Sequence, residues 1–192
     1  MKRLAACAVF AAACIPLAQA QVDPKSLQAG PETRWFNLDR TSAGYVAAGN
    51  LAGTFWAFHV RGQEMKRLAP TTFSLDGAIL QVRAVPRSVF KGGTGTNALG
   101  AHKAYEQEHL AGEAKGMTFR DHRFCREAAV PHEQWIAHAP GGISQAFVTF
   151  LAGDYVLMVA APFENEARER VVERSIGEAC ATFRTQKAGA KP

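Results

Sequence analysis

The sequence contains no apolar stretch long enough to span a membrane as a helix. Its N-terminal apolar run, Leu4 to Cys14, has about half the length that a bilayer-crossing helix needs. The sequence also lacks a long basic cluster: its 22 lysines and arginines are scattered, and a cluster such as Lys66-Arg67 holds two residues. A nucleic-acid-binding protein usually gathers its cations into a patch or a run. We therefore expect neither a retained transmembrane anchor nor a nucleic-acid partner.

Complete nucleotide-binding and nucleophile motifs are missing as well. The glycine-rich segment Lys91–Asn97 lacks the Gly-Lys-Ser/Thr ending of a phosphate-binding loop, because Gly100 is followed by Ala101 and His102. The segment Gly142–Ala146 nearly matches the nucleophile turn of the α/β-hydrolases, but that turn needs a helix after its serine, and an apolar strand pattern follows here. The sequence therefore predicts a flexible connector and no catalytic serine, and we assign no catalytic or cofactor-binding residue.

The first residues have the order of a secretory signal peptide. Lys2 and Arg3 precede the apolar run, and Ala18-Gln19-Ala20 places small residues where a signal peptidase reads them. Cleavage before Gln21 removes 20 of the 192 residues, which leaves 172, and it lowers the net charge from +5 to +3 because two cations are lost. Lipidation of Cys14 is the alternative. The pattern predicts a periplasmic or secreted protein.

The cysteine count predicts one disulfide bond in the mature chain. The sequence has four cysteines, and only Cys125 and Cys180 remain after cleavage. Two such cysteines in an oxidising compartment most often pair. Cys180 lies on the inward row of an amphipathic helix, and Cys125 lies in the extended segment Phe119–Ala128, which we place in the sheet beneath. Two separate buried thiols or one reactive thiol are the alternatives.

Apolar patterns predict several strands. Ser144–Leu151 and Tyr155–Ala161 flank a Gly-Asp turn and are apolar on both faces, as expected of central strands covered on both sides. Gly77–Val85 alternates, which suggests a position nearer an edge. Less regular patterns predict four more strands: Trp35–Leu38, Phe55–Val60, Phe119–Ala128 and Gln134–Ala139. We assign the aromatic side chains within Phe55–Phe58 to the core rather than to a ligand groove.

Two amphipathic segments predict helices at Ala98–Ala111 and Glu164–Phe183, the second with Asn165 as its N-cap. Residues 21–33 and 185–192 have few large apolar groups and are predicted to be a flexible lead and tail. Residues 34–184 then form one α+β domain, with helices packed on a mostly antiparallel sheet.

This order of elements resembles the PsbP-like fold family. The resemblance covers about residues 70–184 and rests on the strand Gly77–Pro86, the middle helix, the hairpin at Gly153-Asp154 and the closing helix that ends in Ala181-Thr182-Phe183-Arg184. It implies an α/β/α sandwich. Members of the family are largely exported accessory or binding proteins, so the resemblance implies no catalytic residues.

One group of residues on the middle helix suggests a different function. His102, Glu106 and His109 share a helix face at positions i, i+4 and i+7, and their ligand types suit zinc or copper. A solvated polar face explains the same spacing, and we assign no metal ligands.

We therefore expect a non-catalytic periplasmic accessory protein that binds another envelope protein or a small ligand, with no cofactor. A metal-assisted hydrolase using the His102, Glu106 and His109 face is the alternative.

Overall fold

The computed structural model describes residues 36–187. The predicted signal peptide, the lead at 21–33 and residues 188–192 lie outside this range. Cleavage before Gln21 and lipidation of Cys14 therefore stay predictions. Within residues 36–187, no helix has both the length and the apolar character needed to cross a membrane.

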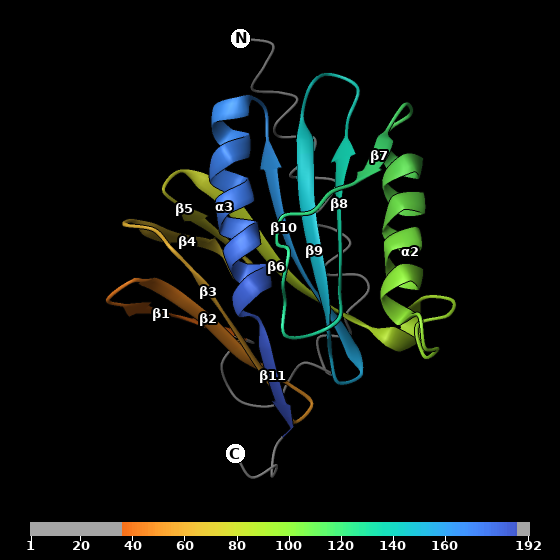
Figure 1. Ribbon diagram of the computed structural model, residues 1–192. Coiled ribbons are helices and arrows are strands. Elements are labelled where there is room, and N and C mark those ends of the chain that lie inside the picture. The colour runs from red at the N-terminus through yellow and green to blue at the C-terminus, as the bar shows by residue number, and fades with distance from the viewer. Residues whose placement is uncertain (1–35, 188–192) are drawn as a thin grey trace.

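Seven strands form the larger of two antiparallel sheets (Figure 1). Their order across the sheet is β4-β5-β6-β10-β9-β8-β7. The strands are β4 (Met65–Ala69), β5 (Thr72–Leu75), β6 (Ala78–Pro86), β7 (Thr118–Asp121), β8 (His132–His138), β9 (Ser144–Ala152) and β10 (Tyr155–Phe163).

The central pair, β9 and β10, confirms the prediction of strands that are covered on both sides. Nearly every residue of both strands is buried. The hairpin turn between them requires glycine at Gly153, whose φ is +62°. A Cβ atom there would also lie 2.5 Å from Oγ1 of Thr54 on the other sheet. The turn therefore suits a close approach of the two sheets.

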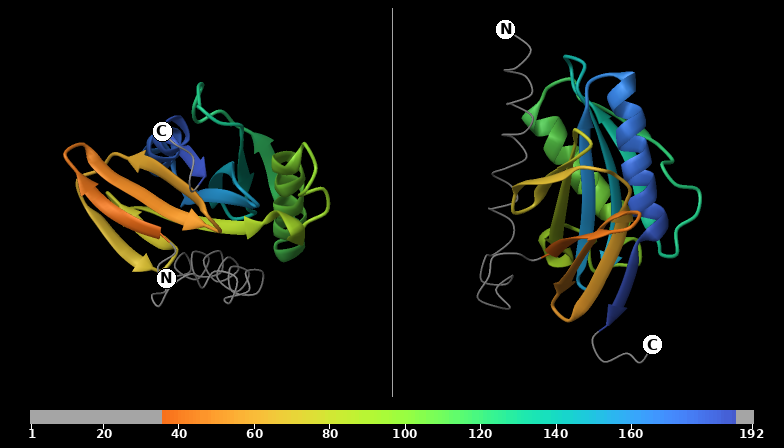
Figure 2. Two further views of the ribbon diagram at one scale, coloured as in Figure 1. Left: turned by 90° about the horizontal axis from the view of Figure 1, so that it is seen from below. Right: turned by 90° about the vertical axis from the view of Figure 1, so that its left-hand side faces the viewer.

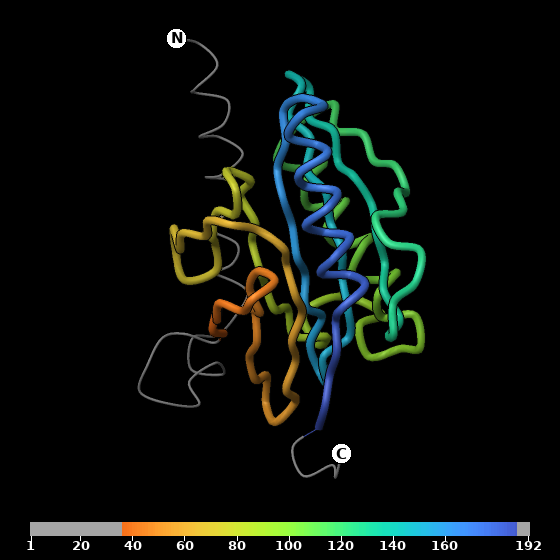
Figure 3. The backbone as a smooth tube through the Cα atoms, turned by 60° about the vertical axis from the view of Figure 1, so that its left-hand side comes forward, coloured from red at the N-terminus to blue at the C-terminus, as the bar shows by residue number. Residues whose placement is uncertain are grey.

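The smaller sheet has four strands in the order β1-β2-β3-β11. These are β1 (Phe36–Thr41), β2 (Gly44–Leu51), β3 (Thr54–Val60) and β11 (Arg184–Lys187). Trp56 and Phe58 of β3 are buried in the core, as predicted, while Phe55 points outward and is 50% exposed. The prediction of a flexible tail from residue 185 is wrong for residues 185–187, because they pair with β3 through backbone hydrogen bonds that need no apolar side chains (Figure 3).

The helices α2 (Ala98–Glu113) and α3 (Glu166–Thr182) pack on opposite faces of the large sheet (Figure 2). Adjacent residues of a strand face opposite sides. On β9, Val148 belongs to the main core with α3, whereas Phe147 packs with Leu110 of α2. Asn165 caps α3 as predicted, since its side chain accepts a hydrogen bond from the Arg168 amide at 3.1 Å. The fold class is α+β, with one main core shared by α3 and both sheets.

Two predictions about the sheet are corrected. β6 lies inside the sheet, between β5 and β10, rather than near an edge, because the predicted edge position overlooked β4 and β5. The strand expected at 119–128 ends at Asp121, so Cys125 lies in the connection between β7 and β8 and not in the sheet. The early end of β7 leaves the first part of β8 at the margin of the sheet.

Candidate functional site

The glycine-rich segment before α2 is an ordered turn rather than a phosphate cradle. The amides of Gly93 and Gly95 donate to the carbonyls of Phe90 and Gly92. Nε of Arg87 donates to the Gly93 carbonyl at 2.6 Å. A Cβ atom on Gly93 would lie 1.8 Å from the Arg87 carbonyl oxygen, so glycine is required for this close approach. These two amides are bonded within the turn. The segment therefore connects β6 to α2, as predicted, but these hydrogen bonds order it, whereas the prediction was of a flexible connector.

Ser144 contacts a histidine, but the hydrogen bonds show that it is not an activated nucleophile. Oγ of Ser144 lies 2.8 Å from Nδ1 of His138, its partner across the β8–β9 pair. Nε of Arg120 donates to Nε2 of His138 at 3.0 Å. An arginine can only donate, so Nε2 of the neutral ring is the acceptor and Nδ1 carries the proton. His138 therefore donates to Ser144 and cannot act as its base.

The same arginine links the edge of the large sheet to α3. Nη1 of Arg120 lies 3.0 Å from Nδ1 of His122, which makes Nδ1 the acceptor. Nε2 of His122 is then free to donate to Glu173 on α3, at 3.1 Å. Nη2 of Arg120 lies 3.6 Å from Glu169, also on α3. Arg120 thus fixes the orientation of two histidine rings, and the group is a structural link.

The predicted solvated face on α2 is corrected by the structure. His102 is completely buried and Glu106 is 6% exposed, and both face the large sheet, while His109 is partly buried. The helix turns its polar side inward because Arg83 of β6 and Thr149 of β9 give the sheet face beneath it a polar character. His102, Glu106 and His109 are not among the groups of potential metal ligands found within residues 36–187. The donor atoms of the trio therefore do not converge on one point.

Burial determines the protonation states of His102 and Glu106. Desolvation, followed by the nearby Arg83 charge, lowers the pKa of His102 to about 3. Desolvation raises the pKa of Glu106 against the opposing effects of Arg83 and His109. Nε2 of His102 lies 3.5 Å from Oε1 of Glu106, yet neither ring nitrogen makes a hydrogen bond in the described part of the chain. His102 is therefore neutral, and its contact with Glu106 is not an ion pair.

An open polar pocket of about 460 Å³ lies between the end of β7 and the start of β8. It is lined by eight residues, in order Asp121, His122, Arg123, Cys125, Arg126, His132, Glu133 and Gln134. Sequence reasoning missed this pocket, because its residues come together only through the detachment of the connection after Asp121.

The charges of the pocket are not balanced. Lys103 of α2 forms an ion pair with Asp121 and lies 3.7 Å from Glu133, so one cation engages both acidic groups of the lining. His122 is paired with Glu173. Arg123 and Arg126 are exposed and have no ion-pair or hydrogen-bond partner within residues 36–187. The pocket therefore carries two guanidinium groups that are open to an anion.

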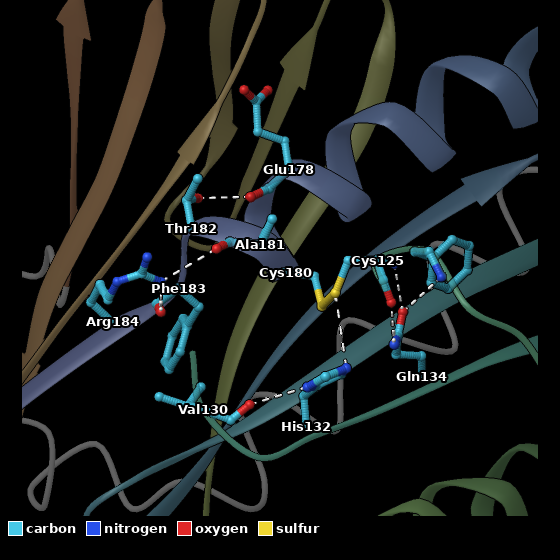
Figure 4. The surroundings of a disulfide bond; sticks show 11 residues. Cys125, Val130, His132, Gln134, Glu178, Cys180, Ala181, Thr182, Phe183 and Arg184 are labelled. Atoms are coloured by element: carbon cyan, nitrogen blue, oxygen red, sulfur yellow. Dashed lines mark hydrogen bonds between the residues drawn. A yellow bond between two sulfur atoms is a disulfide. The ribbon is translucent and has the colours of Figure 1, made fainter. Parts of the chain in front are cut away.

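The disulfide between Cys125 and Cys180 is present, as predicted (Figure 4). Gln134 of β8 holds the backbone of Cys125: its Oε1 accepts from the amides of Phe124 and Cys125, and its Nε2 donates to the Cys125 carbonyl. Cys180 is fully buried in the last turns of α3. The imidazole of His132 lies beside the two sulfur atoms, with Nε2 3.9 Å from Sγ of Cys125. Sequence reasoning assigned no role to His132.

No protein-family model matches the sequence, and a search among characterised proteins found no significant relative.

Proposed function

We propose that this protein is an exported, non-catalytic accessory protein that binds an anionic group in the pocket between β7 and β8. The observation that carries the proposal is the pair Arg123 and Arg126, which have no anionic partner in residues 36–187 while Lys103 engages both pocket carboxylates. Arginine presents a planar set of donors that suits carboxylate or phosphate oxygens. The anion is either a free small molecule or an acidic group of a partner protein.

Two further observations support the proposal. A disulfide is typical of proteins that fold outside the cytoplasm, which agrees with the predicted signal peptide and with a periplasmic or secreted location. The helices on opposite faces of the large antiparallel sheet support the proposal that the fold is an α/β/α sandwich. A hydrolase built on His102 finds less support, because that ring is completely buried.

The first prediction tests the pocket. Thermal melting of oxidised protein beginning at Gln21 is followed during titration with citrate or inorganic phosphate at low ionic strength, where charge pairing is least screened. We expect either anion to raise the melting temperature of the wild type, and the Arg123→Gln/Arg126→Gln variant to lose that rise. An Arg170→Gln/Arg174→Gln variant, which removes two charges from the exposed side of α3, is the matched control and should respond like the wild type.

A second arm separates the two sources of the anion. A partner protein should co-purify from the native envelope with the wild type and with the control variant, but not with the Arg123→Gln/Arg126→Gln variant. A free small anion should raise the melting temperature without co-purification of a partner. Equal melting shifts in all three proteins, together with unchanged co-purification, contradict the proposed pocket.

A further inference from the structure

Residues 36–187 contain one group of three metal-ligating side chains whose donor atoms lie within 4.8 Å of one another: Cys125, His132 and Cys180. They come from three separate segments, the connection after β7, the first residue of β8 and the end of α3. We propose that reduction of the disulfide converts this group into a zinc site. This inference goes beyond the proposed function and does not depend on it.

The histidine is oriented for such a site. Nδ1 of His132 lies 3.1 Å from the Val130 carbonyl oxygen (Figure 4). A carbonyl only accepts, so Nδ1 carries the proton and the lone pair of Nε2 faces the sulfur atoms. Histidines that bind metals usually donate their other ring nitrogen to a carbonyl or carboxylate in this way. Nδ1 of His132 therefore already makes the hydrogen bond that is usual in a metal-binding histidine, and Nε2 is left to bind the metal.

The distances suit a tetrahedral ion. With usual zinc–sulfur and zinc–nitrogen bond lengths, a thiolate and an imidazole on one tetrahedral zinc lie about 3.6 Å apart. Nε2 of His132 and Sγ of Cys125 are 3.9 Å apart in the oxidised protein. The Cα atoms of the two cysteines are 6.0 Å apart. Opening the bond to a thiolate separation of about 3.8 Å needs only side-chain rotation.

Contacts other than the disulfide also hold the two cysteines in place. Three hydrogen bonds between the Gln134 side chain and the backbone of Phe124 and Cys125 hold this part of the connection. Cys180 is held on α3, which packs through Val172 and Ile176 into the main core. Both thiols therefore stay beside His132 after reduction.

Conversion of the disulfide into the zinc site needs a dithiol as the reductant. The dithiol transfers two electrons and two protons to the S–S bond, which breaks into two thiols as the dithiol becomes a disulfide. Cys125 and His132 line the open pocket, so the reductant reaches the bond from the Cys125 side. A zinc ion then displaces the two thiol protons, and Nε2 of His132 supplies the third ligand. The pocket leaves a fourth position open to water.

Oxidation and zinc binding exclude one another, because a disulfide sulfur is not a thiolate ligand. The site is therefore a switch: the oxidised protein carries a cross-link and binds no zinc, whereas the reduced protein binds one ion at the same place.

The test measures zinc affinity by competition with a chromophoric chelator under anaerobic conditions, on protein reduced with a dithiol and freed of it. We expect one tightly bound zinc in the reduced wild type and none in the oxidised wild type. His132→Gln should weaken the affinity of the reduced protein at least tenfold. His59→Gln, an exposed histidine on β3, is the matched control and should leave the affinity unchanged.

Cobalt(II) gives an independent readout of the ligands. The reduced wild type should show a thiolate-to-cobalt charge-transfer band, and Cys125→Ala/Cys180→Ala should lack it. Circular dichroism of the reduced protein shows whether the fold is kept. Equal affinity in the reduced wild type and His132→Gln overturns the proposal, whether the chain is folded or not, because the thiols alone then bind the ion. Failure of reduced wild type to bind zinc overturns it as well. The arginine variants of the pocket leave this result unchanged.

Discussion

His102 shows how a single buried residue couples this fold to pH. In the folded protein the pKa of His102 is lowered to about 3, because desolvation and then the Arg83 charge oppose protonation of the ring. In the unfolded chain the ring takes up a proton below its usual pKa of 6.5. Between these values the unfolded state binds more protons, so the His102 contribution to stability is present above pH 6.5 and is lost as the pH falls toward 3. Glu106, whose pKa is raised, acts in the opposite direction.

We predict that His102→Gln flattens the acid limb of the stability curve. Chemical unfolding from pH 7 to pH 4 should show the wild type losing up to about 1.4 kcal/mol per pH unit relative to the variant. Because both proteins keep Glu106, Arg83 and His109, their difference isolates the His102 ring. His59→Gln should follow the wild type. Parallel curves for wild type and His102→Gln would show that the buried ring is charged or that it is exposed in solution.

At the scale of elements, local signals that depend on neighbouring residues predicted the structure best. Asn165 accepts the Arg168 amide and also provides the carbonyl to which Glu169 donates at 2.9 Å. Helix capping is a property of four consecutive residues, so the sequence was sufficient to find it.

We predict that Asn165→Ala lowers the free energy of unfolding by about 1 kcal/mol, because the Arg168 amide loses its acceptor. Asn165→Asp keeps an acceptor at the same position and should stay within about 0.5 kcal/mol of the wild type. Denaturant melts of the three proteins measure both differences. A loss of stability in the aspartate variant as large as that in the alanine variant would contradict the capping role.

The elements that the sequence did not predict lack an apolar pattern of their own, because pairing or packing with other elements determines their structure. Strand β2 is rich in alanine and glycine, and β11 has four exposed residues, so neither has the apolar pattern of a strand. Their pairing with β3 is what makes them strands. The α2 face was misassigned for the same reason. Helical spacing placed His102 and Glu106 together, but only the sheet with Arg83 and Thr149 determines that this polar face is the buried one.

The candidate pocket follows the same rule. The disulfide was predicted from composition and compartment. The position of His132 beside it was not predicted, because six residues of irregular chain separate it from Cys125 and no periodic pattern relates the two. Arg123 and Arg126 indicate an anion site only when it is known that Lys103 pairs with Asp121 and Glu133, the acidic residues nearby.

For the molecule as a whole, α3 is the element that joins the large sheet to the small sheet. It packs against β9 and β10 of the large sheet and against β3 of the small sheet, and β11 continues directly from its end (Figure 3). Thr182 of α3 also accepts the His59 amide of β3 at 2.8 Å. The disulfide adds a covalent link between this helix and the connection between β7 and β8, which packs on the same face of the large sheet as α3.

The last prediction concerns that link. The two cysteines are 55 residues apart in sequence, and removing a cross-link of this length frees about 4 kcal/mol of unfolded-chain entropy. We expect Cys125→Ala/Cys180→Ala to lower the free energy of unfolding by up to this amount, because Gln134 and the packing of α3 still hold the native geometry. Alanine is chosen because Cys180 is fully buried and a serine hydroxyl there would need a partner. Guanidinium unfolding, with a chelator present to exclude metal, measures the loss. A dithiol should destabilise the wild type by a similar amount and leave the variant unchanged, and a dithiol effect of equal size in both proteins would show that the disulfide is not the origin of the stability.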